Sequence, residues 1–98
     1  MYRHGDVLIE AVTEIPNGAR KLPDCTLAQG ELTGHSHRVA QADAAELYES
    51  SGVLFLRVIK EQATIVHQEH KQIDLPQGLY RVWRQREYSP EEIRIVRD

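Results

Sequence analysis

The chain has 98 residues, of which 41% are hydrophobic and 28% are charged, and its formal net charge is -3. This length allows one domain with a single core and excludes a separate cofactor domain. The ordinary globular composition excludes a disordered chain. The acidic balance argues against binding to the phosphate backbone of nucleic acid, so we expect a small-molecule ligand or a second copy of the chain as the partner.

The N-terminal sequence and the single cysteine both predict a cytoplasmic protein. The first apolar run ends at Glu10 after a few residues, which is shorter than the apolar region of a secretory signal. No run approaches the roughly 20 apolar residues that a membrane helix needs, so no membrane contact is expected. Cys25 cannot form an internal disulfide and is expected to be a free thiol.

Short apolar runs with a period of two, separated by turn residues, predict strands in the first half of the chain. Residues 43–48 are the one segment in which helix propensity competes, because Ala, Glu and Leu are good helix formers. This segment is too short to change the fold class. We expect strands at residues 6–12, 25–32, 35–41 and 46–50, with turns at residues 15–18, at Pro23 and Asp24, and at residues 50–52.

The second half of the chain continues the strand pattern. Residues 53–59 are almost entirely apolar and are expected to be buried on both faces of a sheet. About eight strands in all predict one all-β domain over residues 1–98, a small antiparallel barrel or sandwich. The further strands are predicted at residues 63–67, 73–75, 79–88 and 93–96, with a turn at Pro76-Gln77-Gly78 and a strand end at Pro90.

Four of the five histidines form two tight groups, His35-Ser36-His37 and His67-Gln68-Glu69-His70. Histidine is the commonest protein ligand of transition metals and titrates near neutral pH, so these groups predict a metal site or an acid-base site. Residues two apart in a strand point to the same side, which places His35 and His37 on one face. The same parity places His67 with Glu69, whereas His70 joins them only if the chain bends.

Three imidazoles and a carboxylate suit zinc, iron, manganese or nickel. We predict His35, His37, His67 and His70 as metal ligands, with Glu69 and His70 as the catalytic residues. In this hypothesis Glu69 is a ligand or general base, and His70 is a fourth ligand or a proton carrier. The alternative interpretation is that these histidines are exposed polar residues at strand ends and in a turn.

Three other features are interpreted as structural. His4-Gly5-Asp6 precedes an apolar strand and is interpreted as a turn, so it is left out of the site. Cys25 has no cysteine-hydrolase signature around it and is interpreted as a small core residue. Residues 80–88 interleave aromatic and basic side chains, as single-stranded nucleic-acid platforms do, but the acidic chain favours a sheet strand with solvated arginines.

The segment GELTGHSH is similar to the first motif of the cupin superfamily, in which a glycine precedes a His-x-His pair on a strand of a small β-barrel. The segment LPQG resembles the Pro-x-Gly turn of the second cupin motif. This resemblance implies that His35 and His37 bind a metal together with a glutamate and a third histidine. The wider pattern, with HGDVLI, GELTGHSHRV and HQEHKQIDLPQGLYRVWRQREY, resembles a group of short uncharacterised bacterial and phage proteins and implies no activity.

Three hypotheses of function follow from these patterns. The first is a small cytoplasmic protein whose histidine-rich site binds a divalent metal and activates water or a small ligand. The second is a noncatalytic interaction module, such as a homodimer, that binds through strand edges and residues 80–88. The third is a metal-independent histidine phosphoesterase or ribonuclease, in which paired imidazoles act as acid and base.

Overall fold

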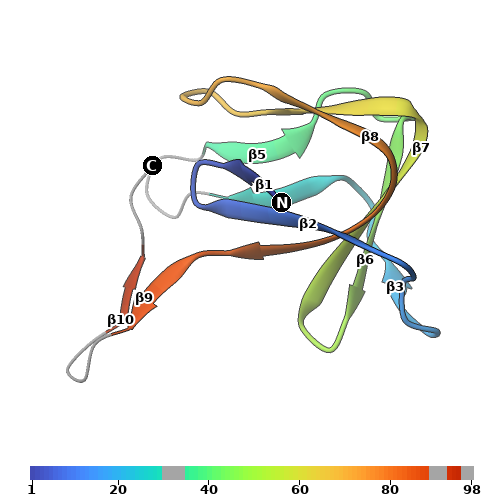
Figure 1. Cartoon of the computed structure of the whole chain (residues 1–98), viewed down its shortest axis with the longest axis horizontal. Helices are drawn as coiled ribbons and strands as arrows, with labels where there is room; N and C mark the ends of the chain where they lie inside the picture. Colours follow the sequence, from blue (N-terminus) through green and yellow to red (C-terminus); the bar gives the residue numbers. More distant parts are fainter. Residues whose placement is uncertain (30–34, 89–92, 96–98) are drawn as a thin grey trace.

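A computed structural model of the protein describes residues 1–29, 35–88 and 93–95, and Figure 1 shows its course. The described part contains ten strands and no helix, and every strand pair is antiparallel, which confirms the all-β antiparallel prediction. The strands are β1 (Tyr2–His4), β2 (Val7–Val12), β3 (Arg20–Lys21), β4 (Thr26–Gln29), β5 (Ser36–Val39), β6 (Ala45–Ser50), β7 (Val53–Val66), β8 (Ile73–Arg84), β9 (Arg86–Tyr88) and β10 (Ile93–Ile95).

Eight of these strands form one open sheet. Its main path runs β1-β2-β8-β7-β5-β4, while β6 pairs with β7 and β3 pairs with β6. The strands β9 and β10 form a separate two-stranded sheet. The path does not return from β4 to β1, so the sheet is not closed, and the barrel half of the predicted fold is not supported. The two ends of the path remain edge strands.

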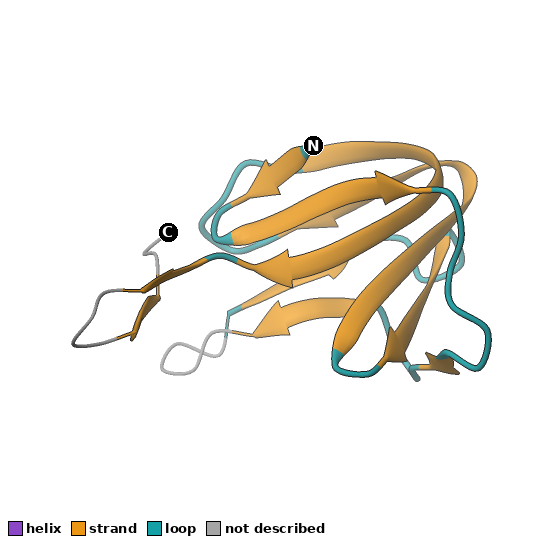
Figure 2. Ribbon diagram, turned by 60° about the horizontal axis from the view of Figure 1, so that its bottom comes forward, coloured by secondary structure: helices purple, strands orange, loops and turns teal. Residues whose placement is uncertain are grey.

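The long strands β7 and β8 carry the bend that shapes the sheet. Their register breaks between Val58 and Gln62, where residues 59–61 of β7 lie opposite Gln77 alone. Extra residues on one strand increase its local bend and twist. Gln77 Nε2 donates a hydrogen bond of 2.6 Å to the Ile59 carbonyl within this irregular stretch. Figures 1 and 2 show β7 and β8 curving over, so that the two parts of the sheet face each other.

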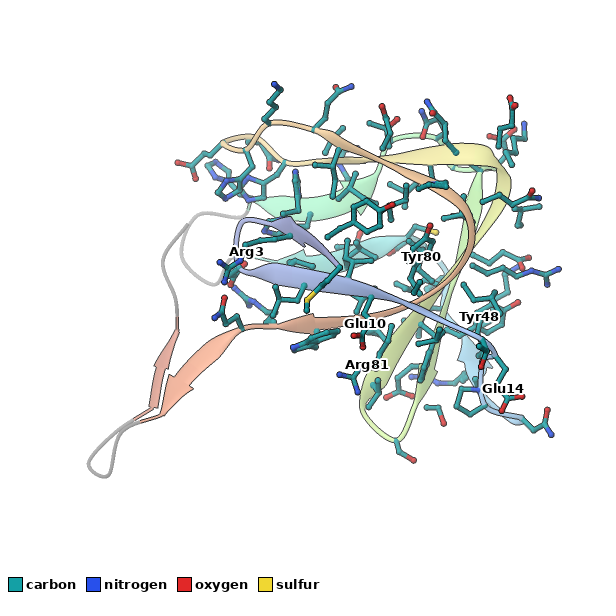
Figure 3. All side chains as sticks on the ribbon, in the orientation of Figure 1. Arg3, Glu10, Glu14, Tyr48, Tyr80 and Arg81 are labelled. Carbon is teal, nitrogen blue, oxygen red and sulfur yellow. The ribbon has the colours of Figure 1, made fainter. Side chains whose placement is uncertain are left out.

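The core lies between these facing parts. Side chains alternate across each strand, and in Figure 3 Tyr80 lies inside the curved sheet while Arg81 lies outside it. Phe55 and Leu56 are both buried, as expected for residues 53–59, but Arg57 and Ile59 are exposed. The core cluster contains residues from six strands of the open sheet, β2, β4, β5, β6, β7 and β8. Its members include Val7, Ile9, Leu27, Val39, Leu47, Leu56, Ile65, Leu75 and Val82.

Several predicted boundaries were wrong. The two strands predicted at residues 53–59 and 63–67 are one strand, β7, and the turn predicted at Pro76-Gln77-Gly78 lies inside β8. Pro76 lies opposite Gln62, next to the register break, and irregular positions of this kind are where sheets accommodate proline. The strand β6 begins at Ala45, so the competing helix does not form. Residues 30–32, Pro90 and Val96 of the predicted strands lie outside the described residues.

The part of the chain that the structure describes contains no helix that is long and apolar enough to cross a membrane.

Two isoleucines on β7 test the position of the core. Ile65 is 0% exposed and Ile59 is 40% exposed. The same substitution can therefore be made once in the core and once on the surface. We predict that Ile65→Ala lowers the free energy of unfolding by about 2–5 kcal/mol, because it leaves a cavity. Ile59→Ala should lower it by less than about 1 kcal/mol. Urea denaturation measures both, and equal losses would contradict this placement of the core.

Candidate functional site

All five histidines of the chain lie together at one end of the folded sheet. His4 ends β1, His35 immediately precedes β5, His37 lies in β5, and His67 and His70 follow β7. The ring centroids lie 4.3 Å apart for His37 and His67, 4.6 Å for His67 and His70, 5.0 Å for His4 and His37, and 5.6 Å for His35 and His67. The structure therefore joins the two histidine groups of the sequence and adds His4 to them.

His4 and Asp6 enter the site through the tight turn between β1 and β2. Gly5 adopts a φ of 63° in this turn, a conformation that glycine accepts readily. His4 and Asp6 are only 2% and 1% exposed. The sequence interpretation of His4-Gly5-Asp6 as a turn is correct, but leaving both side chains out of the site misses two buried members of it. The sequence signal that could have identified them is a polar residue on each side of Gly5, directly before an apolar strand.

The buried carboxylate of Asp6 forms an ion pair with Arg84 and lies close to His37. Asp6 Oδ1 lies 3.5 Å from His37 Nε2 without forming a hydrogen bond. Asp6 Oδ2 accepts a hydrogen bond of 3.0 Å from Arg84 Nε and lies 2.8 Å from Arg84 Nη2. A carboxylate facing Nε2 favours the tautomer with the ring proton on that nitrogen, which leaves a lone pair on Nδ1. His37 Nδ1 lies 2.9 Å from His4 Nδ1. In that tautomer His4 Nδ1 donates and His37 Nδ1 accepts.

The chain leaves the ladder after Val66, and this departure brings His70 to the site. Glu69 N donates a hydrogen bond of 2.9 Å to His67 Nδ1, which closes a tight bend. The bend that the sequence argument requires for His70 is therefore present. One nitrogen from each of His37, His67 and His70 lies within 4.8 Å of the other two. His37 is buried, and the other two are half-buried.

His35 and Glu69 face each other beside this group. His35 Nδ1 lies 2.7 Å from Glu69 Oε1, and the Glu69 side chain is 62% exposed. In a continuous strand Ile65, His67 and Glu69 would all point to the same side. Ile65 does point into the core, but the exposed Glu69 side chain does not. The reason is that regular alternation ends with β7 at Val66. The structure thus divides the predicted residues into a three-histidine group and a separate His35–Glu69 pair.

The three-histidine group is a candidate metal site, because one nitrogen of each ring lies within 4.8 Å of the other two. Two nitrogens bound to one tetrahedral zinc at about 2.0–2.1 Å lie about 3.3 Å from each other. The three nitrogens lie within 4.8 Å of one another, so the rings must move closer together to share one ion. Three imidazoles leave at least one coordination position for water or a ligand, which is the arrangement of catalytic rather than structural zinc sites.

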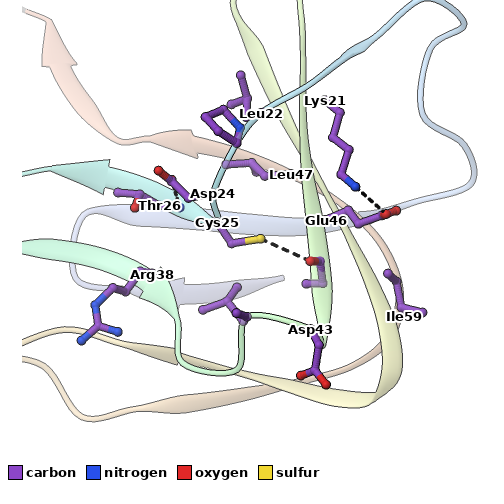
Figure 4. Close-up of a pocket in the computed structure, with 14 residues that line it drawn as sticks. Lys21, Leu22, Asp24, Cys25, Thr26, Arg38, Asp43, Glu46, Leu47 and Ile59 are labelled. Atoms are coloured by element: carbon purple, nitrogen blue, oxygen red, sulfur yellow. Dashed lines mark hydrogen bonds and ion pairs between the residues drawn. The ribbon is translucent and has the colours of Figure 1, made fainter.

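Cys25 lies away from the histidines in a cavity of about 460 Å³ (Figure 4). Its Sγ donates a hydrogen bond of 3.4 Å to the Ala45 carbonyl. Burial raises the pKa of the thiol, whereas a nucleophilic cysteine needs a lowered pKa. Among the residues lining this cavity there is no histidine. Cys25 therefore has the environment of a packed thiol.

The Asp6–Arg84 pair provides a test of the buried side of the site. We predict that Asp6→Asn lowers the free energy of unfolding by about 2 kcal/mol or more, because it leaves the Arg84 charge without its carboxylate. Glu49→Gln is the matched control, since Glu49 pairs with Arg20 at 3.6 Å on the surface. The control should lose less than about 1 kcal/mol. Similar losses in the two variants, measured by urea denaturation, would contradict a buried pair at Asp6.

Comparison with known proteins places the chain in a family. The family model described as "Domain of unknown function (DUF8820)" matches residues 3–85. A search of the curated proteins finds no significant match. A search of the solved structures finds none either. Because the family model covers most of the chain, including every residue of the histidine site, the protein belongs to the DUF8820 family.

Proposed function

We propose that the protein binds a divalent transition metal through His37, His67 and His70 and uses it to activate water or a small ligand. The observation that carries this proposal is the convergence of three ring nitrogens within 4.8 Å, from a strand and a bend that lie 30 residues apart in the sequence. Imidazole ligands suit zinc, iron and nickel, whereas manganese prefers carboxylates. A bound metal would supply a Lewis acid at this position.

The Asp6 carboxylate supports the proposal. Metal-bound histidines commonly give their second ring nitrogen to a carboxylate, which orients the ring and raises its basicity. Asp6 Oδ1 lies 3.5 Å from His37 Nε2, so it is the candidate for this place in a complex that holds the metal on His37 Nδ1. His4 is a candidate fourth ligand, because its Nδ1 lies 2.9 Å from His37 Nδ1, near the spacing of two nitrogens on one metal. A metal bound to both nitrogens would replace the hydrogen bond between His4 and His37.

The proposed ligand set differs from that implied by the cupin resemblance. That resemblance predicts His35 and a glutamate as ligands, but His35 and Glu69 pair with each other. Glu69 in this arrangement is a candidate base at the rim of the site, and His70 is a ligand. The resemblance itself and the cytoplasmic location stay predictions.

The first test is metal binding by protein prepared without an affinity tag. We predict that Co²⁺ gives a visible absorption band and that Zn²⁺ raises the melting temperature. His37→Ala should weaken binding by more than about 100-fold, because it removes a ligand. His35→Ala is the matched control and should weaken binding by less than about tenfold. Absence of any bound metal, or equal losses in the two variants, would show that the ligand set is wrong.

The second test follows the hydrogen bond from Glu69 N to His67 Nδ1. A metal on Nδ1 occupies the accepting lone pair, and a metal on Nε2 moves the ring proton to Nδ1. Either mode breaks this hydrogen bond, whose length is 2.9 Å. We predict that Zn²⁺ shifts the Glu69 amide resonance upfield and speeds its hydrogen exchange. An unchanged Glu69 amide in zinc-loaded protein would exclude His67 as a ligand.

The contact of 2.9 Å between His4 Nδ1 and His37 Nδ1 favours one alternative. Two imidazoles in contact, with Asp6 behind one of them, also form an acid-base pair that needs no metal. This alternative predicts phosphoester cleavage that survives chelators and is lost in both His4→Ala and His37→Ala. The metal proposal predicts that chelators abolish any activity and that added Zn²⁺, Fe²⁺ or Ni²⁺ restores it.

A further inference from the structure

A small hollow adjoins the histidine site at His67. It has a volume of about 130 Å³ and is lined by Ser36, Arg38, Val66, His67 and Gln68. Ser36 and Arg38 flank His37 on β5, so they point to the opposite face from that buried ring. The hollow therefore lies on the outer face of β5, and His67 borders both the hollow and the three-histidine group.

Three polar side chains that line the hollow, besides His67, carry hydrogen-bond donors. Arg38 contributes a guanidinium, Ser36 a hydroxyl and Gln68 an amide. Gln68 Oε1 already accepts a hydrogen bond of 3.1 Å from Ser36 N, so its amide oxygen is used and its NH₂ group is left to donate. Among the residues that the structure describes, no carboxylate lines the hollow. This donor set has the polarity of a site for a negatively charged group.

Arg38 differs from the paired basic residues of the surface. Arg20, Lys21, Arg57 and Lys60 each lie within 4 Å of a glutamate or aspartate oxygen. Within the described part of the chain no ion pair is formed by Arg38, nor by Arg3, Lys71 or Arg81; of these four residues only Arg38 lines the hollow, and it also borders the cavity of Cys25. An arginine without a carboxylate in such a place is suited to bind an oxyanion through two parallel N–H groups.

We infer that this hollow binds an oxyanion group, a phosphate or a carboxylate, carried by a small molecule. A volume of about 130 Å³ corresponds to roughly four water molecules, so it holds such a group and leaves the rest of the molecule outside. An anion bound by Arg38 lies against His67, next to the three-histidine group. Only the further step, that this anion belongs to the substrate, rests on the proposed metal site.

The test is an NMR titration of the metal-free protein, treated with a chelator, with inorganic phosphate, acetate and chloride at constant ionic strength. Phosphate or acetate should give saturable shifts at the Ser36 and Gln68 amides, the Gln68 side-chain NH₂ and the Arg38 Nε–H. Saturation by phosphate alone indicates a phosphate ligand, and saturation by acetate indicates a carboxylate. Chloride should give no saturable shift.

Substitution of Arg38 sharpens this test. Arg38→Gln should weaken binding by about tenfold or more, the effect of losing a charged hydrogen bond. Arg38→Lys should retain part of the affinity, since it keeps the charge but not the planar fork. Arg57→Gln removes the same charge from β7 away from the hollow and should leave binding unchanged.

Two results would overturn the inference. One is the absence of a saturable shift with both phosphate and acetate in the wild-type protein, and the other is equal affinity in Arg38→Gln and the wild type. Because no metal is present, neither result depends on the metal proposal. A protein that binds phosphate but no metal would refute only the proposed function, and one that binds metal but no anion would refute only this inference.

Discussion

The bend in the β7–β8 ladder is the constraint on which the rest of the structure depends. The strand β2 pairs with residues 79–84 of β8, on one side of the register break, whereas β5 pairs with the far end of β7, on the other side. In a flat sheet three strands, β2, β8 and β7, would separate β1 from β5. Folding at the bend encloses the core and also carries His4 on β1 across to His37 on β5.

The same fold creates an electrostatic requirement inside the site. Asp6 is 1% exposed, and a carboxylate buried to this extent is tolerated only when it is paired. Arg84 supplies the pairing charge from β8 while 26% of its side chain remains exposed to water. The desolvation of such a pair offsets much of its attraction, so its contribution to stability is small compared with that of the core. The pair also holds a negative charge 3.5 Å from His37 Nε2.

The residue types of the sequence locate much of the site, but strand parity does not describe all of it. The pairs His35-x-His37 and His67-x-x-His70 mark two segments that meet in the fold, and the bend required for His70 is present. Glu69 departs from parity because β7 ends at Val66. His4 and Asp6 were missed because their approach depends on contacts across the folded sheet, 33 residues apart for His4 and His37, which no local pattern records. The Pro76-Gln77-Gly78 turn signal was overridden by the irregular ladder around it.

The central claim is that His37, His67 and His70 share one metal ion. The most direct measurement is an anomalous difference map from crystals of zinc-loaded protein, collected on both sides of the zinc absorption edge. The account predicts a single strong peak about 2.0–2.1 Å from one nitrogen of each of the three rings. A peak held by His35 and Glu69 without these three rings, or no peak in protein saturated with zinc, would contradict it.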